Sequence, residues 1–218
     1  MSLIPHEKFI FVRYNMSVEK ETARLEAFSD GVFAIAITLL VLEIKVPRMW
    51  ADATATDLWK ELGRLWPSYV AYIITFGAIL IMWVNHHDSF KMLNKVSRPF
   101  IYSNGLLLLL VTFFPFPTAL LAEYITAKSN SAAVVFYCAY HLLVSITYNI
   151  MTYTMQKPVY LLRPEIRQAL LNRLKRNTRM GLFVYSFTTV FSIWFPVTGL
   201  TLNSLLWIVW ATMPFPKI

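Results

Sequence analysis

The chain has 218 residues, of which 57% are hydrophobic and 15% are charged, and its mean hydropathy is +0.52. These values exclude an ordinary soluble domain and predict an integral membrane protein. In such a protein, the net charge of +8 is better explained by basic residues on the cytoplasmic side than by nucleic-acid binding. The single cysteine, Cys138, leaves no intrachain disulfide to be formed.

Six apolar segments divide the chain, and most of them approach the roughly twenty residues that a helix needs to cross a bilayer. The sequence therefore predicts an all-α integral membrane protein with six transmembrane helices. We find no separate soluble region, so residues 1–218 are expected to form one domain. The spans are expected at residues 26–46, 65–85, 100–122, 132–155, 180–196 and 200–214.

Capping residues and prolines predict where some of these helices begin and end. Ser17, followed by two glutamates, is typical of a helix N-cap. Pro115 and Pro117 predict a kink or break at the far end of the third span. Thr198 and Gly199 predict a tight turn between the fifth and sixth spans. The mixed-charge segment between the first two spans is expected to be a loop.

The distribution of lysine and arginine indicates the orientation. With both termini in the cytoplasm, 15 of the 20 basic residues lie on the cytoplasmic side, as the positive-inside rule requires. The other side holds Lys45, Arg48, Lys60, Arg64 and Lys128. The basic linker 157–179 is partly amphipathic and is expected to lie on the anionic inner leaflet. Its apolar residues at helical spacing are Ile166, Leu170, Leu171 and Leu174.

The first span carries a narrow stripe of residues along one side. At 100° per residue, an arc of roughly 100° contains Ile35, Thr38, Leu39 and Leu42. Asp30 lies about 140° from Ile35 on the same wheel, so its carboxylate is expected to face other helices. The stripe then faces lipid, a neighbouring helix or an ion pathway. Spacing alone favours the first two, and a lone threonine often bonds only to its own backbone.

Asp30 needs a partner, because a carboxylate at the membrane boundary is costly unless it is paired or hydrated. The topology brings three polar residues to the same boundary, and these are its expected partners: Asn85, His86 and His87. Two interpretations follow. The group is either a structural clamp that fixes the packing of the first helix or a set of titratable groups that passes protons.

A metal site and an enzyme active site are both disfavoured. Zinc normally takes three or four protein ligands, and the histidines other than His86 and His87 are His6 and His141, which are distant in the chain. The sequence contains no nucleophile elbow, zinc-protease motif or phosphate-binding glycine loop. We therefore expect no cofactor and no catalytic residues, although an enzyme acting on lipid or quinone is the third class considered.

The signature Arg24-x-x-x-Phe28-Ser29-Asp30, followed by GVFAIAITLL, resembles the prokaryotic branch of the transmembrane protein 175 family. Members are potassium-permeable channels related to the endosomal and lysosomal potassium channel of animals. The resemblance implies a multi-pass protein of the plasma membrane and a homotetramer whose pore is lined by the first helix. Animal members carry two six-span units, and this chain has the size of one.

The resemblance also implies roles for single residues. Ile35 falls on a pore position, with Leu39 and Leu42 further along the same face, and Thr38 on a threonine layer. Arg24, Phe28, Ser29 and Asp30 are implied to form a packing network with Asn85 and His86 or His87. A straight helix, however, places Arg24 and Phe28 on the stripe side, so either the helix bends near Gly31 or these residues reach a neighbouring subunit.

Together these features predict a passive, potassium-selective channel. The chain lacks a Thr-Val-Gly-Tyr-Gly run, so selectivity must come from side chains and is expected to be modest. A ring of Ile35 forms a hydrophobic constriction, and Thr38 hydroxyls replace part of the hydration shell of K⁺. The alternative is a proton-coupled transporter or proton pathway that uses Asp30 and the pair His86 and His87.

Overall fold

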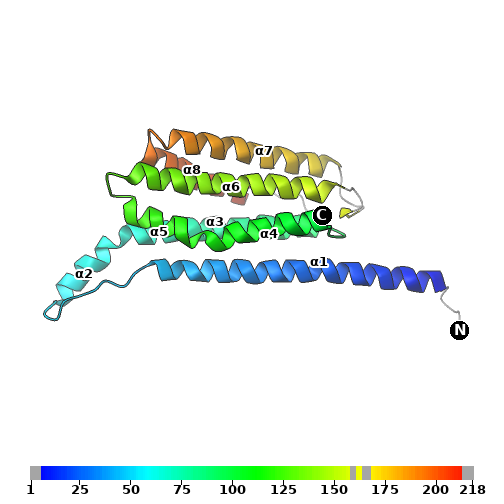
Figure 1. Cartoon of the computed structure of the whole chain (residues 1–218), viewed down its shortest axis with the longest axis horizontal. Coiled ribbons are helices and arrows are strands. Elements are labelled where there is room, and N and C mark those ends of the chain that lie inside the picture. Colours follow the sequence, from blue (N-terminus) through cyan, green and yellow to red (C-terminus); the bar gives the residue numbers. More distant parts are fainter. Residues whose placement is uncertain (1–5, 158–160, 164–167, 213–218) are drawn as a thin grey trace.

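The chain folds as a helical bundle, which confirms the all-α class (Figure 1). The computed structural model describes residues 6–157, 161–163 and 168–212, with side-chain surroundings from residue 21 onward except residue 169. The elements are α1 (His6–Leu39), the 3-10 helix η1 (Leu40–Glu43), α2 (Ala55–Arg64), α3 (Trp66–Lys91), α4 (Arg98–Phe113), α5 (Pro115–Tyr124), α6 (Asn130–Gln156), α7 (Gln168–Phe191) and α8 (Pro196–Thr212).

The helix α1 lies along one edge of the bundle, next to α3 and α4, whereas α6, α7 and α8 form the opposite side (Figure 1). The largest core cluster joins both sides. It contains Phe33 of α1, Ile79 of α3, Leu107 of α4, Val144 of α6 and Leu174 of α7. Burial of these side chains stabilises the bundle. One side of α1 is left uncovered by the other described helices of the chain.

Four segments of the described chain are long and apolar enough to cross a membrane: Glu21–Glu43, Trp66–Lys91, Arg98–Tyr124 and Asn130–Gln156. They correspond to the first four predicted spans. The helices α7 and α8 occupy the places of the fifth and sixth. Since α7 begins in a basic segment and α8 has 17 residues, spanning by these two helices stays a prediction.

The structure corrects the predicted limits of the first span. Because α1 begins at His6, Ser17 lies inside the helix and is not its N-cap. Helical structure ends at Glu43, after the backbone tightens into η1, rather than at Val46. The predicted loop that follows contains α2. A capping box starts this helix: the side chains of Thr54 and Asp57 each accept a hydrogen bond from the backbone N–H of the other residue. Hydrogen bonds from the side chain and the backbone of Thr54 lower the pKa of Asp57.

The prolines of the third span act as predicted. The helix α4 ends at Phe113, and α5 starts at Pro115, which has no amide hydrogen to continue the ladder. The two helices together make the long apolar segment that precedes α6.

The second half of the chain differs from the prediction in two places. The basic linker and the fifth span form one helix from Gln168, and Leu171 and Leu174 are buried in the core rather than placed on the membrane surface. Ile166 lies outside the described residues. Thr198 and Gly199 lie within α8, and the turn is at residues 192–195. A Cβ at Gly199 would lie 2.1 Å from Ser192 Oγ, so a side chain there would prevent this close approach of α7 and α8.

Candidate functional site: the two faces of α1

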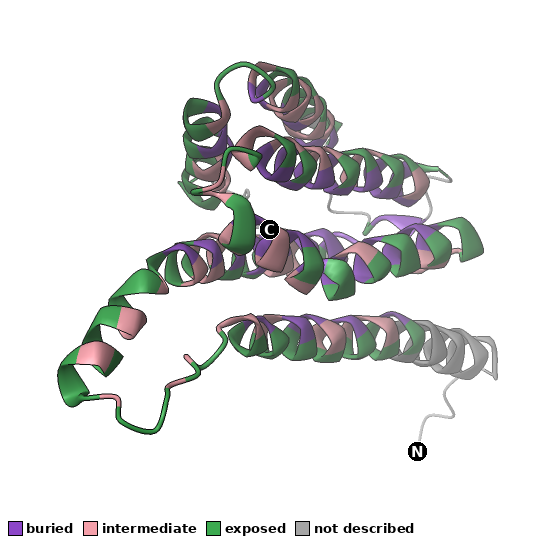
Figure 2. Cartoon of the chain, turned by 60° about the vertical axis from the view of Figure 1, so that its left-hand side comes forward, coloured by how far each residue is buried: buried purple, intermediate pink, exposed green. Residues whose placement is uncertain are grey.

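The helix α1 has one buried and one exposed face, and the residues of its signature are divided between them. Ser29, Phe33, Ala36 and Leu40 are buried and point toward the bundle. In Figure 2 the buried side of α1 faces the other helices and the exposed side faces away from them. The apolar part of α1 is the least covered of the four candidate spans, since 22% of it is buried against 50% for α6.

A chain of hydrogen bonds fixes the buried face. His86 of α3 lies 2.8 Å from Asn104 Oδ1 on α4, and Asn104 Nδ2 donates to Ser29 Oγ at 3.0 Å. Ser29 in turn donates to the carbonyl of Leu25 at 2.8 Å. Since the single hydroxyl proton of Ser29 is used there, Asn104 must donate to Ser29 and accept from His86. His86 therefore donates through its Nε2, and its ring packs against Phe33 and Phe90.

Asp30 has a different partner from the three that the sequence suggested. Trp83 of α3 donates its indole N–H to Asp30 Oδ1 at 2.8 Å. His87 instead pairs with Glu26 one turn earlier on α1, with Nδ1 and Oε1 2.8 Å apart, and its ring stacks on Trp83. The expected pairing of Asp30 with Asn85 or His87 is wrong, and His86 interacts with Asp30 electrostatically while its hydrogen bond goes to Asn104.

The remaining network residues lie elsewhere. Asn85 lines a cavity on another side of α3. Arg24 and Phe28 share the exposed face with Ile35, because α1 is one continuous helix across Gly31. The bend near Gly31 that was one of the two expected explanations is therefore absent. Arg24 and Phe28 do not take part in the hydrogen-bond network that the described side chains form.

The four predicted pore residues all lie on the exposed side of the first span, with Ile35, Thr38 and Leu39 in α1 and Leu42 in η1, which continues that side. The exposed fraction is 59% for Ile35, 40% for Leu39 and 61% for Leu42, and Thr38 is exposed between them. Thr38 donates its hydroxyl hydrogen to the carbonyl of Ile35 at 2.8 Å. This hydrogen bond to the backbone of the same helix uses the hydroxyl hydrogen of Thr38. The lone pairs of Oγ1 stay free to face outward, where they can accept a hydrogen bond or contact a cation.

A metal centre is not found here. Over the described residues, no group of three or more histidine, cysteine, aspartate or glutamate side chains is placed to hold an ion. His141 is buried in α6, where Nδ1 lies 3.0 Å from the carbonyl of Tyr137. It belongs to an aromatic cluster and is distant in the fold from the α1 network.

Sequence reasoning missed Glu26, Trp83 and Asn104, which supply the actual partners. Each carried a signal. Asn104 is a polar residue inside an apolar span, where an unpaired amide is costly, so it needed a partner on a neighbouring helix. A tryptophan inside an apolar span likewise needs an acceptor for its N–H, and Trp83 lies one turn before His87. What the sequence did not contain was the register between α1, α3 and α4.

Comparison with known proteins agrees with this arrangement. The family described as "Endosomal/lysosomal potassium channel TMEM175" matches residues 24–115. A potassium channel of Chamaesiphon minutus is 53% identical over 131 residues, which are 60% of this chain and 64% of that protein. An endosomal/lysosomal proton channel TMEM175 of Gallus gallus is 34% identical over 112 residues, or 49% of this chain and 22% of that protein. The bacterial potassium channels of this comparison are matched over 40–64% of their own lengths.

The crystal structure of a lysosomal potassium-selective channel TMEM175 homologue from Chamaesiphon minutus has the same fold, with a TM-score of 0.79 and 40% identity. The alignment covers 88% of this chain and 97% of that one. The fold and the α1 site therefore define a membrane-embedded, all-helical protein with the fold of an ion channel. The chain belongs to the TMEM175 family, as the signature in α1 suggested.

Asn104→Leu tests the hydrogen-bond chain of the buried face. The substitution keeps the number and branching of the side-chain heavy atoms but leaves Ser29 and His86 without their partner, so we expect the free energy of unfolding to fall by about 1–3 kcal/mol. Thermal unfolding of the purified protein in detergent measures it. Tyr102→Phe, at an exposed position of the same helix, is the control and should leave the midpoint unchanged. Equal midpoints for both variants would contradict this role of Asn104.

Proposed function

We propose that the chain is a subunit of a passive, potassium-selective cation channel, a homotetramer whose pore is lined by the exposed face of α1. The observation that carries the proposal is the division of α1 into a hydrogen-bonded face and an open apolar face. A helix that lines a pore must lie at the edge of its own subunit, because the edge is what meets the symmetry axis. The potassium channels that resemble this chain support the same function.

The proposed channel lies in the plasma membrane and has six spans per subunit, with α7 and α8 as the last two and both termini in the cytoplasm. Its partners are other copies of the chain, the lipid bilayer and permeant K⁺. It needs no cofactor and binds no nucleic acid. Membership in a family described as an ion channel, rather than the absence of a catalytic motif, supports a protein that is not an enzyme.

The composition of the exposed face favours contact with protein and water over contact with lipid. Gly31 and Ala34 are exposed on the same side as Thr38, and no heavy atom lies within 4 Å of where a Cβ on Gly31 would be. Small residues let membrane helices approach one another closely. The exposed face of α7 instead carries Phe183 and Phe187, which are suited to lipid. Arg24, at one end of the α1 face, also calls for a hydrated or paired environment.

Ile35 would form the constriction. Four branched side chains meeting at an axis make a narrow apolar ring from which water withdraws, and such a ring closes a pore by dewetting. Leu39 and Leu42 would extend the apolar lining one and two turns further along the same face. In this arrangement Arg24 and Phe28 lie at the cytoplasmic mouth and contact the neighbouring subunit.

Thr38 would supply selectivity. Its Oγ1 lies about 4.5 Å along the axis from Ile35, given the rise of an α-helix. The back-bond to Ile35 fixes the hydroxyl hydrogen, so four oxygens with free lone pairs would face the axis as a layer. Hydroxyl oxygens have weaker dipoles than a cage of carbonyls, which is why we expect a modest preference for K⁺ over Na⁺.

Ile35→Asn tests the constriction. A polar ring wets readily, so potassium flux from proteoliposomes should rise several-fold. Ile35→Ala should raise it less, because the ring widens but stays apolar. The matched control is Phe183→Ala, which changes an apolar residue on α7 that is also exposed and should leave flux unchanged. Unchanged flux in Ile35→Asn would remove Ile35 from the pore.

Thr38→Ala tests the selectivity layer. Loss of the hydroxyl removes the cation contact without filling the pore, so the ratio of K⁺ to Na⁺ permeability should fall toward about one. Reversal potentials under bi-ionic conditions measure this ratio. Thr112→Val, which removes an exposed, back-bonded hydroxyl from α4, should not change it. A ratio that is preserved in Thr38→Ala would place selectivity elsewhere.

Protons are the second candidate, because the Gallus gallus relative is named a proton channel. The proposed relay of Asp30 with His86 and His87 lacks continuity over the described side chains. Trp83 donates to Asp30 and cannot pass a proton on, and His86 bonds Asn104. A pathway through these groups predicts flux that a pH gradient drives, that saturates, and that Asp30→Asn abolishes in an assembled protein. A passive channel instead conducts potassium with no pH gradient.

A further inference from the structure

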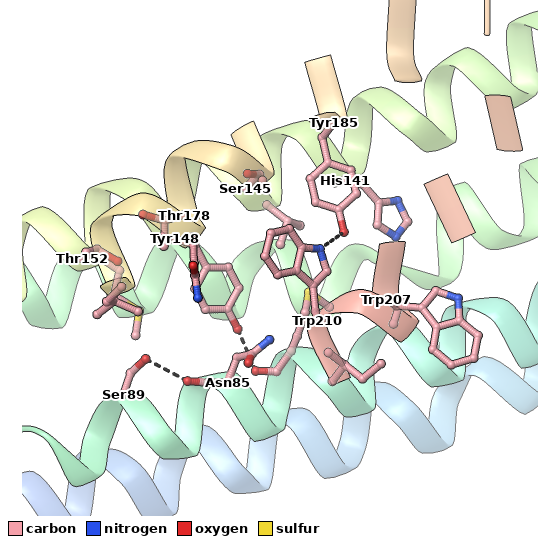
Figure 3. Close-up of a pocket in the computed structure, with 18 of the residues that line it drawn as sticks. Asn85, Ser89, His141, Ser145, Tyr148, Thr152, Thr178, Tyr185, Trp207 and Trp210 are labelled. Carbon is pink, nitrogen blue, oxygen red and sulfur yellow. Dashed lines mark hydrogen bonds between the residues drawn. The ribbon is translucent and has the colours of Figure 1, made fainter. Parts of the chain in front are cut away.

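A cavity of about 130 Å³ lies between α3, α6, α7 and α8, on the opposite side of α3 from α1 (Figure 3). Side chains bridge the helices around it. Tyr148 of α6 donates to the carbonyl of Met82 on α3 at 2.7 Å, and Trp210 of α8 donates to Tyr185 of α7 at 3.0 Å. Asn85, which the sequence assigned to the Asp30 network, faces this cavity instead. No part of the proposed pore uses it.

The cavity is long and narrow. Its lining on α7 runs from Leu170 through Arg173 to Tyr185, and the helical rise makes the last two about 18 Å apart. This length is about one leaflet of a bilayer whose hydrocarbon core is roughly 30 Å thick. A cavity of roughly 150 Å³ takes up a benzene ring, so the present volume holds a few methylene groups and therefore part of a linear chain.

The two ends of the cavity differ in chemistry. Arg173 is the one charged residue in the lining, no aspartate or glutamate lines it, and no described residue forms an ion pair with Arg173. Uncharged polar side chains surround that end, from Asn85, Ser89 and Asn177. Further along, most of the lining is apolar or aromatic, with Val144, Met82, Trp207 and Trp210, and it also carries the polar side chains of His141, Ser145 and Asn203. A cationic, hydrogen-bonding end followed by a mainly apolar passage matches an anionic amphiphile.

We propose that this cavity binds an acyl chain that carries an anionic headgroup, with the headgroup on Arg173 and the chain between α3 and the helices α6 to α8. The guanidinium supplies charge-assisted hydrogen bonds to a carboxylate or phosphate, and the side-chain amides of Asn85 and Asn177 add uncharged donors. A phospholipid and a free fatty acid share this chemistry. The site is independent of the α1 pore, because its lining comes from four other helices.

Quenching of tryptophan fluorescence tests the proposal, since Trp207 and Trp210 line the cavity. The purified protein in detergent is titrated with phosphatidylglycerol or stearic acid brominated on the acyl chain, and with brominated phosphatidylcholine as the neutral reference. We expect saturable quenching by an anionic probe that the neutral lipid does not reproduce, and loss of this component in Trp207→Phe/Trp210→Phe. The anionic probe that gives the effect identifies the source of the chain.

Two substitutions on α7 separate a site from general attraction to a basic surface. Arg173→Gln should weaken binding of the anionic probe about tenfold. Arg176→Gln removes the same charge one turn away from a residue outside the lining, and should change binding less than twofold. Val144→Phe, which fills the passage and keeps both arginines, should abolish the saturable component. Equal effects of the two arginine variants, or equal quenching by the neutral lipid, would overturn the proposal.

Discussion

The hydrogen bond between Asn104 and Ser29 is the constraint on which the position of α1 depends. The amide of Asn104 and the hydroxyl of Ser29 lie in two apolar spans, where no water is available to hydrogen-bond them. They therefore bond to each other, and this bond fixes the depth and the rotation of α1 relative to α4. The bond of Asp30 to Trp83 and the pair of Glu26 with His87 set the same rotation from α3. Once that face is fixed, Ile35, Thr38 and Leu42 can only point away from the subunit.

The sequence was sufficient for the fold class, the first four spans and the break at Pro115, because these follow from apolar length and backbone chemistry. It was also sufficient for the two faces of α1, since a helical wheel separates Asp30 from Ile35. The partner of Asp30 could not be predicted in the same way. Trp83, His86 and His87 lie within about a turn of one another, and choosing among them requires the register between two helices.

Other errors have similar physical causes. The helix α2 was not predicted, because its segment is rich in charged residues and has no long apolar run. Its capping box, formed by Thr54 and Asp57, stabilises the start of the helix. The basic linker looked like a surface helix because Leu171 and Leu174 gave it an amphipathic pattern. An amphipathic pattern does not show whether the apolar face packs on lipid or on other helices. In the structure, Leu171 and Leu174 pack in the core of the bundle.

The helix α3 separates the two regions of interest in the subunit. Trp83, His86 and His87 face α1, whereas Met82, Asn85 and Ser89 line the cavity on the other side. Successive residues of one helix thus serve two surfaces, because neighbours in sequence are 100° apart. The same geometry explains how Asn85 was assigned to the wrong group, since its position in the chain fits either surface.

The central claim is that copies of the exposed face of α1 meet at a common axis, and thiol cross-linking tests it most directly. The experiment replaces the single native cysteine in Cys138→Ala, introduces Ile35→Cys or Phe183→Cys, and treats the protein in membranes with a short bifunctional thiol reagent. The account predicts a covalent dimer from Ile35→Cys, because one thiol per chain can form one cross-link, and monomer from Phe183→Cys. The reverse pattern would contradict it, since α7 would then lie at the axis and α1 in the lipid.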